Sequence, residues 1–527
     1  MGRPGVSVDP GARTPACAEL DAGDVFVSSH VRGALMVCGT TSNAGKTTVV
    51  TGLCRLLARR GVRVAPFKAQ NMALNSVVTA DGGEIGRAQG IQAFAAGIEP
   101  DVAMNPILLK PTGERTSQVI VFGRPVGVMT AREYHDAKPQ LLGPVLGALA
   151  DLRSQYDVVL CEGAGSPAEI NLLDRDIVNL RIADEAQIPA VLVGDIDLGG
   201  VFASLYGTVA LLPDALGARV RGFVINRLRG DPALLLDGCA QLHERTGVPT
   251  LGVLPWIPGL TLDAEDSLAL RDLQQGMLPS TADALDVAVI ALPRISNFTD
   301  VDPLTVEPGV RVRLVGDAAA LGVPDLVIVP GTKSTVEDLI WLREQRLDLA
   351  LRETPATVLG ICGGYQMLGR SIDDDVESGV GYCEGLGRLP VRTVFEPDKV
   401  VERCAGTSLG HEIVGYRIHH GRVEPEGGRP FVDVAGAVDG VQDGTMYGTT
   451  VHGLFENDGF RRAFLALVAE RAGKDFVASS ERFADARTAR IDRIADTLEA
   501  HLDLDAVMAL VAEGAPAPRP AARGTRP

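Results

Sequence analysis

Short apolar runs alternate with helix-like stretches along most of the chain. The first apolar run covers residues 34–38, and residues 46–60 repeat apolar positions with the period of an amphipathic helix. Strands that are apolar on both faces are typical of a parallel sheet covered by helices on both sides. The first half of the chain is therefore predicted to be an α/β domain with a parallel sheet. Its other predicted strands are residues 62–66, 158–161, 190–193, 220–225 and 250–254.

A second series of apolar runs begins after a polar, turn-rich stretch at residues 263–285. These runs also alternate with helix-like sequence, so the second half is predicted to be another α/β domain. In such sheets ligands bind at the carboxyl ends of the strands. The predicted strands are residues 287–292, 326–329, 357–361 and 449–452.

Both ends of the chain lack this alternation. The first 30 residues mix Gly, Pro, Asp and Ala without periodicity, and the last residues are rich in Pro and Ala, so both ends are predicted to be disordered. The predicted organisation is a disordered tail at 1–30, a first α/β domain at 31–262, a linker at 263–285, a second α/β domain at 286–480, a helical segment at 481–513 and a disordered tail at 514–527.

The composition is that of an ordinary globular protein, but the charge is strongly acidic. Of the 527 residues, 46% are hydrophobic and 22% charged, and the formal net charge is −17. Such a chain is not expected to bind nucleic acid or anionic membranes through general electrostatics. An anionic substrate would therefore need local basic side chains or backbone N–H groups.

The eight cysteines indicate free thiols in a reducing compartment. No two stand as Cys-x-x-Cys, the spacing of zinc ribbons and thioredoxin-like redox pairs. No apolar run is long enough to span a bilayer, and the N-terminus lacks a basic-then-apolar secretory pattern. The chain is therefore predicted to be cytoplasmic, without membrane or nucleic-acid partners.

A glycine-rich loop joins the first predicted strand to the first predicted helix. Backbone N–H groups of such a loop and the helix N-terminus bind phosphate oxygens, while a lysine after the loop reaches the β- and γ-phosphates. Five residues separate Gly39 from Gly45, one more than in the common Walker A motif, and dethiobiotin-synthetase-like ATPases carry this longer loop. The alternative is a chance glycine turn before a helix. The predicted ATP ligands are Gly39, Thr40, Asn43, Gly45, Lys46, Thr47 and Thr48.

Two oxygen-bearing side chains are predicted to hold Mg²⁺ beside the phosphates. They are the hydroxyl of Thr47 and the carboxylate of Glu162, which ends the strand at residues 158–161. Mg²⁺ in nucleotide sites takes one or two carboxylates in addition to phosphate oxygens. Asp195 and Asp197, after another strand, are weaker candidates, and an ordinary surface carboxylate is the alternative for Glu162.

A cysteine stands at a predicted strand-to-helix turn in the second domain. Cys362 follows the strand at residues 357–361 and precedes Gly363; small residues allow the sharp turn that exposes a nucleophile, and a helix N-terminus stabilises a thiolate. The base that such a thiol needs is predicted to be His452, because histidines are scarce and this one follows a strand-like run. Gly331, in a turn after another strand, and Gly363 are predicted to supply the N–H groups of an oxyanion hole.

Together, these two motifs predict a glutamine amidotransferase. Cys362 and His452 predict thiolate attack on an amide with release of ammonia, and the phosphate loop predicts activation of a second substrate by ATP. The alternatives for the two residues are a buried structural thiol and an ordinary loop histidine. A P-loop switch ATPase is an alternative from another class, but it would leave the whole second domain without a purpose.

Several ordered sequence blocks resemble the cobyric acid synthase family of cobalamin biosynthesis. The resemblance runs from residue 34 to residue 454. It implies a P-loop, dethiobiotin-synthetase-like parallel-sheet domain followed by a class I glutamine amidotransferase-like α/β domain. The blocks are residues 67–72, 106–111, 162–172, 199–203, 254–256 and 294–300, together with the turn around Cys362.

The resemblance implies a glutamine-hydrolysing carbon–nitrogen ligase. The family uses ATP and glutamine to amidate the b, d, e and g carboxylates of adenosylcobyrinic acid a,c-diamide, giving adenosylcobyric acid. ATP and Mg²⁺ are the expected cofactors, with no cobalt or zinc held by the protein, and glutamine and a corrinoid are the expected substrates; homo-oligomerisation is left open. The nearest alternative is cobyrinic acid a,c-diamide synthase, but residues 162–171 favour the cobyric acid synthases.

Two positions depart from related domains. Many glutaminase domains of this class carry a glutamate two residues after the histidine, where this chain has Leu454, so a Cys–His dyad without a third residue is expected. Glu456 is a weak substitute. Leu198 stands where the family often has an arginine, so any role of that arginine is in doubt here. The candidate corrinoid contacts, chosen by location alone, are Gln70, Asn71 and Asn171.

Overall fold

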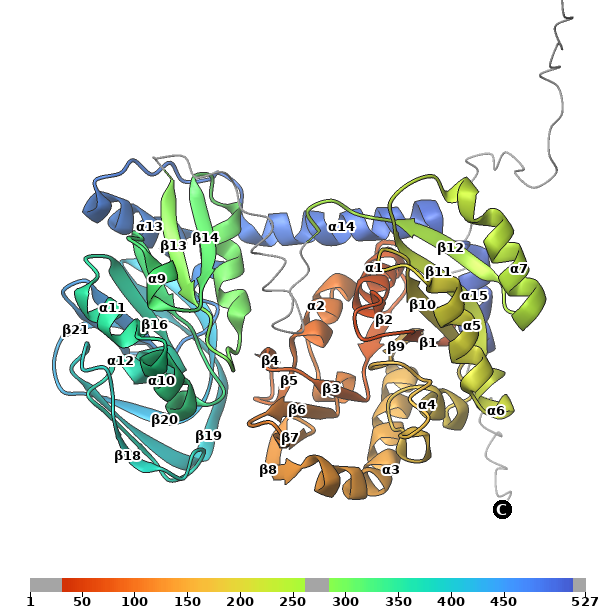
Figure 1. The fold of residues 1–527 in the computed structure, drawn as a ribbon, viewed down its shortest axis with the longest axis horizontal. Helices are drawn as coiled ribbons and strands as arrows, with labels where there is room; N and C mark the ends of the chain where they lie inside the picture. The colour runs from red at the N-terminus through yellow and green to blue at the C-terminus, as the bar shows by residue number, and fades with distance from the viewer. Residues whose placement is uncertain (1–30, 261–283, 515–527) are drawn as a thin grey trace, which may run out of the picture.

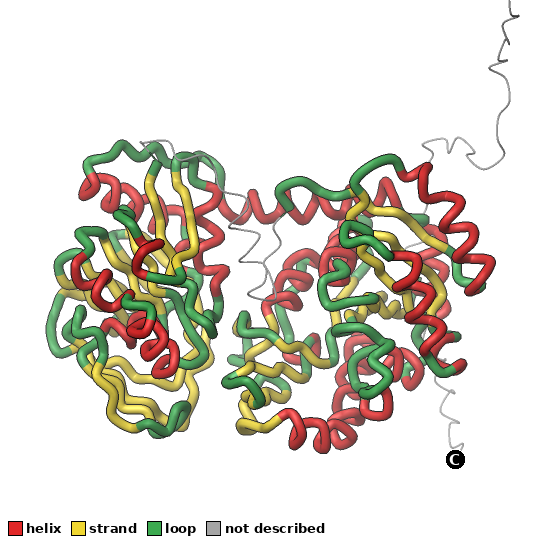
Figure 2. Tube along the Cα trace, viewed as in Figure 1, coloured by secondary structure: helices red, strands yellow, loops and turns green. Residues whose placement is uncertain are grey.

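The computed structural model describes residues 31–260 and 284–514, which form two α/β domains side by side (Figure 1). Helices and strands alternate in both domains (Figure 2). This confirms the predicted fold class. The predicted tails and linker lie outside the described residues, except for residues 284–285 and 514. No helix within the described ranges is both long and apolar enough to cross a bilayer.

A six-stranded parallel sheet forms the centre of the N-terminal domain. Its strand order is β12-β11-β10-β1-β9-β2, and every neighbouring pair is parallel. This confirms the sheet predicted from the unbroken apolar runs. The strands are β1 (Gly33–Gly39), β2 (Val64–Phe67), β9 (Val158–Glu162), β10 (Ala190–Asp195), β11 (Val220–Leu228) and β12 (Thr250–Pro255).

Apolar cores cover both faces of this sheet. Leu35 and Val37 pack on the side of α1 (Lys46–Arg59), whereas Met36 and Cys38 pack on the opposite side, as expected from the alternation of side chains along a strand. The other helices are α2 (Arg87–Ala96), α3 (Ala131–Gln155), α4 (Leu180–Glu185), α5 (Val201–Leu211), α6 (Asp214–Gly217) and α7 (Leu236–Thr246), with short 3-10 helices at η1 (Val102–Met104), η2 (Leu173–Arg175) and η3 (Pro232–Leu235).

Two small sheets that the sequence pattern did not predict lie on the side of this domain that faces the C-terminal domain (Figure 1). One has the order β3-β6-β7-β8, and the other is an antiparallel pair of β4 and β5. Their strands are β3 (Gln70–Met72), β4 (Ser76–Val78), β5 (Glu84–Gly86), β6 (Ile107–Pro111), β7 (Thr116–Val121) and β8 (Arg124–Thr130).

The C-terminal domain contains an eleven-stranded mixed sheet. Its parallel part has the order β14-β13-β15-β16-β23, in which β13, β15 and β16 match predicted strands and β14 was not predicted, and an antiparallel part continues from β23. The strands are β13 (Leu285–Ile290), β14 (Val310–Val315), β15 (Leu326–Val329), β16 (Thr357–Ile361), β17 (Ser371–Asp374), β18 (Gly381–Glu384), β19 (Val391–Ser408), β20 (His411–Pro425), β21 (Arg429–Val434), β22 (Ala437–Asp443) and β23 (Met446–Thr449).

The last predicted strand was placed too late in the sequence. It was expected at residues 449–452, but β23 ends at Thr449, so His452 lies in the loop that follows. The helices of this domain are η4 (Phe298–Val306), α9 (Ala318–Leu321), α10 (Thr335–Glu344), α11 (Leu347–Glu353), α12 (Gly363–Leu368), η5 (Leu454–Glu456) and α13 (Asp458–Ala472).

The chain returns to the N-terminal domain at its C-terminal end. Helix α14 (Phe483–His501) crosses one end of the molecule, and α15 (Leu504–Glu513) follows it (Figure 1). Ile494 and Leu498 of α14 join the core beside α1. Arg55 of α1 pairs with Asp492 at 2.7 Å. The segment at 481–513 is therefore largely helical, and its helices complete the N-terminal domain.

Candidate functional site

The phosphate loop between β1 and α1 is fixed by contact with β11. Gly45 has a φ of 100°, a left-handed conformation that favours glycine, and a Cβ atom here would lie 2.0 Å from Nδ2 of Asn226. The same amide donates to the carbonyl of Ala44 at 2.9 Å. At the other end, the N–H of Thr40 donates to the carbonyl of Val193 at 2.9 Å. The loop therefore holds its backbone in one conformation at the start of α1.

The Lys46 side chain lies within this loop. Its ammonium group donates to the carbonyls of Thr41 at 2.9 Å, Ser42 at 3.1 Å and Gly165 at 3.2 Å. Lys46 is almost fully buried, yet it lines the large cavity described below. Its position is that of a lysine that contacts bound phosphates. The other predicted ligands that line this cavity are Asn43, Gly45, Thr47 and Thr48.

Thr47 and Glu162, the predicted Mg²⁺ ligands, are in contact. The hydroxyl of Thr47 donates to Oε1 of Glu162 at 2.9 Å, and Lys68 pairs with the same oxygen at 3.0 Å. Gln92 donates to Oε2 of Glu162 at 2.5 Å. A hydroxyl and a carboxylate beside a phosphate loop are hard oxygen donors of the kind Mg²⁺ takes in addition to phosphates, so these residues fit the ion.

A cavity of about 1340 Å³ extends from the phosphate loop to the C-terminal domain. Small-molecule pockets are typically about 300–1,000 Å³, so this one has room for a nucleotide and a large second substrate. The C-terminal domain contributes Arg294, Ile295 and Phe298 to its wall, and α14 contributes Ile494 and Leu498. The cavity is therefore completed by three separate parts of the chain.

Two of the three predicted corrinoid contacts line this cavity. Gln70 accepts a hydrogen bond from the hydroxyl of Tyr134 at 2.6 Å, and Asn71 donates to Gln89 at 3.0 Å. Asn171 is exposed, next to Leu172, which lines the cavity. All three stay predictions.

The weaker Mg²⁺ candidates are paired with arginines. Asp195 lies 2.7 Å from Arg227, and Asp197 lies 2.7 Å from Arg229. Leu198, which stands where the family often has an arginine, is 83% exposed. These ion pairs give Asp195, at the end of β10, and Asp197, in the loop that follows, a structural role.

Cys362 occupies the sharp turn between β16 and α12. Its φ is 51° and ψ is −109°, an unusual conformation for a residue other than glycine. Its N–H donates to the carbonyl of Thr449 at 2.8 Å, which ties the turn to the end of β23. Strain of this kind is typical of a nucleophile held at the end of a strand. The residue is buried but lines a small cavity at the domain interface.

His452 is oriented by a carboxylate that sequence reasoning missed. Nδ1 of His452 lies 2.7 Å from Oδ2 of Asp300, whose Oδ1 accepts from the N–H of Gly453 at 2.8 Å. All three residues of the resulting Cys362–His452–Asp300 arrangement are buried. The structure therefore departs from the expected dyad, because Asp300, from η4, adds a carboxylate in contact with the histidine.

The electrostatic environment favours a protonated His452. Burial alone would lower the pKa of this imidazole, but the carboxylate of Asp300 and the neighbouring Cys362 raise it to about 10. An imidazolium beside the sulfur stabilises a thiolate, which is the nucleophilic form of cysteine. The arrangement can therefore attack an amide carbonyl and return a proton to the leaving nitrogen.

The two predicted oxyanion residues lie close to this centre. A Cβ atom on Gly331 would lie 2.9 Å from Cε1 of His452, and one on Gly363 would lie 3.1 Å from the N atom of Thr332. The turn after β15 and the start of α12 therefore meet beside Cys362, without room for larger side chains. Their role in stabilising an oxyanion stays a prediction.

Glu456 does not serve as the substitute for the missing glutamate. It pairs with Arg87 at 2.8 Å and with Arg487 at 2.9 Å, and these two cations hold its pKa at about 2 although burial would raise it. Leu454 is buried in the apolar core beside His452. Glu456 therefore joins the two domains and α14.

Comparison with known proteins assigns a domain family to each half of the chain. Residues 35–269 match the CobQ/CobB/MinD/ParA nucleotide binding domain, and residues 286–460 match the CobB/CobQ-like glutamine amidotransferase domain. The cobyric acid synthase of Frankia casuarinae is 53% identical, over 93% of this chain and 98% of its own length. That of Streptomyces coelicolor is 54% identical, over 92% and 98%, and that of Rhodococcus jostii is 52% identical, over 94% and 99%. The chain, a glutamine-hydrolysing ligase, therefore belongs to the cobyric acid synthase family.

Proposed function

We propose that this enzyme uses ATP and the amide nitrogen of glutamine to amidate the b, d, e and g carboxylates of adenosylcobyrinic acid a,c-diamide, which gives adenosylcobyric acid. One observation carries the proposal: a single short segment lines both cavities. Pro293, Arg294, Ile295 and Phe298 line the cavity that contains the phosphate loop, and Ser296 and Asn297 line the cavity at Cys362. This arrangement supports transfer of a small product from one site to the other.

Glutamine hydrolysis takes place at Cys362. The thiolate adds to the side-chain carbonyl of glutamine, and the N–H groups near Gly331 and Gly363 stabilise the developing oxyanion. The carbon–nitrogen bond breaks as His452 gives its proton to the leaving nitrogen, which departs as ammonia. Water then hydrolyses the thioester, with His452 as the base, and releases glutamate. Asp300 keeps the imidazole in position through both steps.

Amidation takes place beside the phosphate loop. A substrate carboxylate attacks the γ-phosphorus of ATP and ADP leaves, which gives an acyl phosphate. Ammonia then adds to the acyl carbon and displaces phosphate. Lys46 and the backbone of the loop stabilise the negative charge on the transferring group. Thr47 and Glu162 would hold Mg²⁺, which supplies further charge neutralisation at the phosphates.

A pair of reciprocal asparagine contacts joins residues that line the two cavities. The N–H of Ser76 donates to Oδ1 of Asn297 at 2.9 Å, and the N–H of Phe298 donates to Oδ1 of Asn75 at 3.2 Å. Asn75 lines the larger cavity and Asn297 the smaller one. We infer that ammonia crosses here, since this polar and buried contact keeps it from protonation in bulk water.

Mass spectrometry of the product tests the function and the nitrogen route together. The corrinoid diamide is incubated with ATP, Mg²⁺ and glutamine labelled with ¹⁵N in its amide, in the presence of unlabelled ammonium at a concentration that does not support synthesis by itself. We expect four exchanges of oxygen for nitrogen, all labelled. A product with fewer exchanges, or no reaction with this substrate while cobyrinic acid is converted, would contradict the proposed substrate. Dilution of the label by free ammonium would contradict the internal route.

Replacing Asp300 with asparagine is expected to lower glutamine hydrolysis about 10²- to 10⁴-fold, because His452 loses the carboxylate that orients it. The pKa of His452 should also fall, since the carboxylate is what raises it against burial. The alkaline limb of the pH–rate profile, which reports loss of the imidazolium, should therefore move to lower pH. Ammonia-dependent synthesis should be retained.

A matched control for this variant is Glu456→Gln. This carboxylate lies on η5, directly after the loop that contains His452, but pairs with Arg87 and Arg487. We expect the pH profile of glutamine hydrolysis to stay unchanged in that variant. An Asp300→Asn enzyme with the wild-type pH profile would show that Asp300 is not part of the catalytic site.

The cytoplasmic location and homo-oligomerisation of the enzyme stay predictions.

A further inference from the structure

The N-terminal domain contributes a side chain to the cavity at Cys362. This cavity has a volume of about 30 Å³, and Lys110 of β6 lines it together with Lys333, Lys399, Glu377 and His419 of the C-terminal domain. Lys110 is buried, and the next residue of β6, Pro111, lines the larger cavity. The strand β6 therefore connects the two sites.

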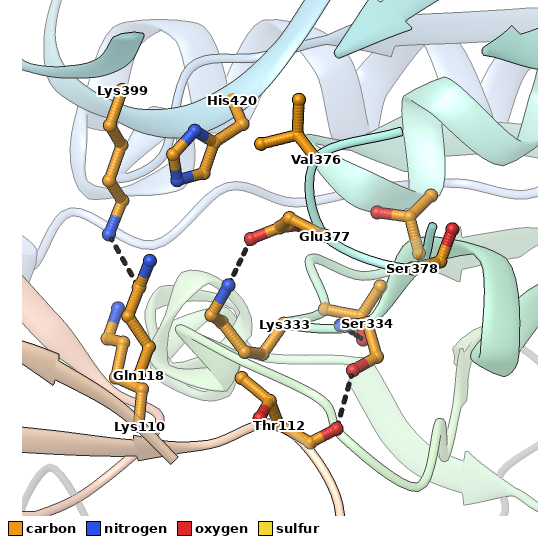
Figure 3. A network of polar contacts seen from close by, with 12 residues as sticks. Lys110, Thr112, Gln118, Lys333, Ser334, Val376, Glu377, Ser378, Lys399 and His420 are labelled. Carbon is orange, nitrogen blue, oxygen red and sulfur yellow. Dashed lines mark hydrogen bonds and ion pairs between the residues drawn. The ribbon is translucent and has the colours of Figure 1, made fainter. Parts of the chain in front are cut away.

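Lys110 and Lys399 share one buried carboxylate. Both contact Glu84 of β5, Lys110 at Oε1 and Lys399 at Oε2, the latter at 2.6 Å. The side chains of Glu84, Lys110 and Lys399 are 0%, 3% and 5% exposed. Figure 3 shows Lys399 reaching from the C-terminal domain toward Lys110 and Gln118 on the strands of the N-terminal domain.

This cluster carries an excess of one positive charge. Burial would raise the pKa of Glu84, but the two ammonium groups lower it below its usual range, so the carboxylate is ionised. Burial lowers the pKa of Lys399 to about 8 despite Glu84 beside it. An uncompensated buried cation is costly. Binding of an anion at this position would remove that cost.

The remaining charges around the cavity do not supply that anion. Among the described residues that line this cavity, Glu377 is the one with a carboxylate, and it is paired with Lys333 (Figure 3). His419 and His420 are neutral, because burial lowers the pKa of His419 to about 4 and also lowers that of His420. The cavity thus offers a site for a carboxylate at Lys110 and Lys399.

The cavity also offers hydrogen-bond acceptors for a cation. Nδ1 of His419 donates to the carbonyl of Gly421 at 2.8 Å, so its Nε2 carries a lone pair. Nε2 is buried and has no hydrogen-bond partner among residues 31–260 and 284–514. His419 and Glu377 both line the cavity, so each can accept a hydrogen bond from an ammonium group there. A free amino acid carries a carboxylate and an ammonium on one carbon, which matches this pair of subsites.

We propose that Lys110 and Lys399 bind the α-carboxylate of glutamine, while Glu377 and His419 receive its α-ammonium group. This inference rests on the proposed function, since it assigns the substrate contacts of the same glutaminase. A cavity of about 30 Å³ holds one or two waters, so it must widen to admit glutamine. Because Lys110 comes from the N-terminal domain, the glutamine site is complete only when the two domains are docked.

The first test uses the unmodified enzyme. Hydrolysis of glutamine is compared with hydrolysis of glutamine α-amide, in which an uncharged carboxamide replaces the α-carboxylate. A charge-assisted hydrogen bond is worth about 1.5–3 kcal/mol, so the KM for the α-amide should be about 10- to 100-fold higher than that for glutamine. Equal KM values would overturn the proposal, but they would leave the assignment of Cys362 as the nucleophile unaffected.

The second test is Lys110→Met. The variant keeps Lys399 paired with Glu84, so the buried cluster becomes neutral and the fold should be retained. We expect the KM for glutamine to rise about 10- to 100-fold with little change in kcat, and the KM for the α-amide to stay near its wild-type value. Gln118→Met is the matched control: it removes a neighbour of Lys399 at 3.4 Å but leaves both lysines, and its KM for glutamine should not change.

The outcomes separate this inference from the proposed function. If Lys110→Met changes the KM values of both substrates equally, or changes neither KM, Lys110 does not bind the carboxylate. If the wild-type enzyme hydrolyses neither glutamine nor its α-amide, the proposed glutaminase itself fails. If Lys110→Met cannot be obtained folded, the comparison of the two substrates with the wild-type enzyme still decides the matter.

Discussion

Replacing Cys362 with alanine is expected to abolish glutamine-dependent synthesis, by roughly 10³-fold or more, while ammonia-dependent synthesis is retained. The sulfur is the one atom that becomes bonded to the glutamine carbonyl, so no neighbouring group replaces it. The phosphate loop lies in the other domain and in a separate cavity, and its contacts do not involve Cys362. The measurement is product formation with glutamine and with ammonium as alternative nitrogen sources.

A buried cysteine of the same domain provides the control. Cys404 is 8% exposed on β19, and burial raises the pKa of its thiol to about 11, so it is a poor nucleophile. Cys404→Ala should keep both activities. If added ammonium fails to rescue Cys362→Ala although the variant is folded, Cys362 has a role beyond glutamine hydrolysis.

Contiguous motifs were predictable because one local turn contains all their parts. The phosphate loop needs a strand, two glycines, a lysine and a helix in succession, and the turn at Cys362 needs a strand, a cysteine and small residues. Glu162 was predictable because it ends an apolar strand next to the phosphate loop in a parallel sheet. In each case the fold class determines where the residue lies.

Residues that act across the sequence could not be found in this way. Asp300 is 152 positions from His452, on a 3-10 helix with no periodic pattern, and only the folded chain brings them together. Lys110 and Lys399 are separated by most of the chain and meet at a carboxylate that has no motif around it. The spacing of residues along the sequence does not reveal such pairs.

The unpredicted strands have a similar physical cause. β19 and β20 pair along most of their length, but charged residues such as Glu402 and Arg417 face each other across them. In β19 the alternation expected of a half-exposed strand is interrupted by Glu396, Pro397 and Asp398, which weakens the signal. The helices α14 and α15 were predicted as helical, but that they complete the N-terminal domain follows only from their packing on α1 and β1.

Lys46→Ala is expected to lose synthesis with either nitrogen source, by roughly 10²- to 10³-fold or more. The ammonium group of Lys46 is held by three backbone carbonyls, so it is fixed at the position where phosphate charge develops. Alanine leaves this position empty, and no other side chain of the loop carries a positive charge. Added ammonium should not rescue the variant, in contrast to Cys362→Ala, whereas glutamine hydrolysis at Cys362 should still be measurable.

Lys138 provides a control for the loss of a lysine from the same cavity. Its side chain lies over the ring of Tyr134, at 5.7 Å, on α3 rather than on the phosphate loop. Lys138→Ala should therefore keep the wild-type KM for ATP, measured with ammonium as the nitrogen source, whatever its effect on the corrinoid. Wild-type turnover by Lys46→Ala would remove the phosphate loop from the reaction. If Lys46→Ala loses ammonia-dependent synthesis while Cys362→Ala keeps it, the two half-reactions are divided between the two domains.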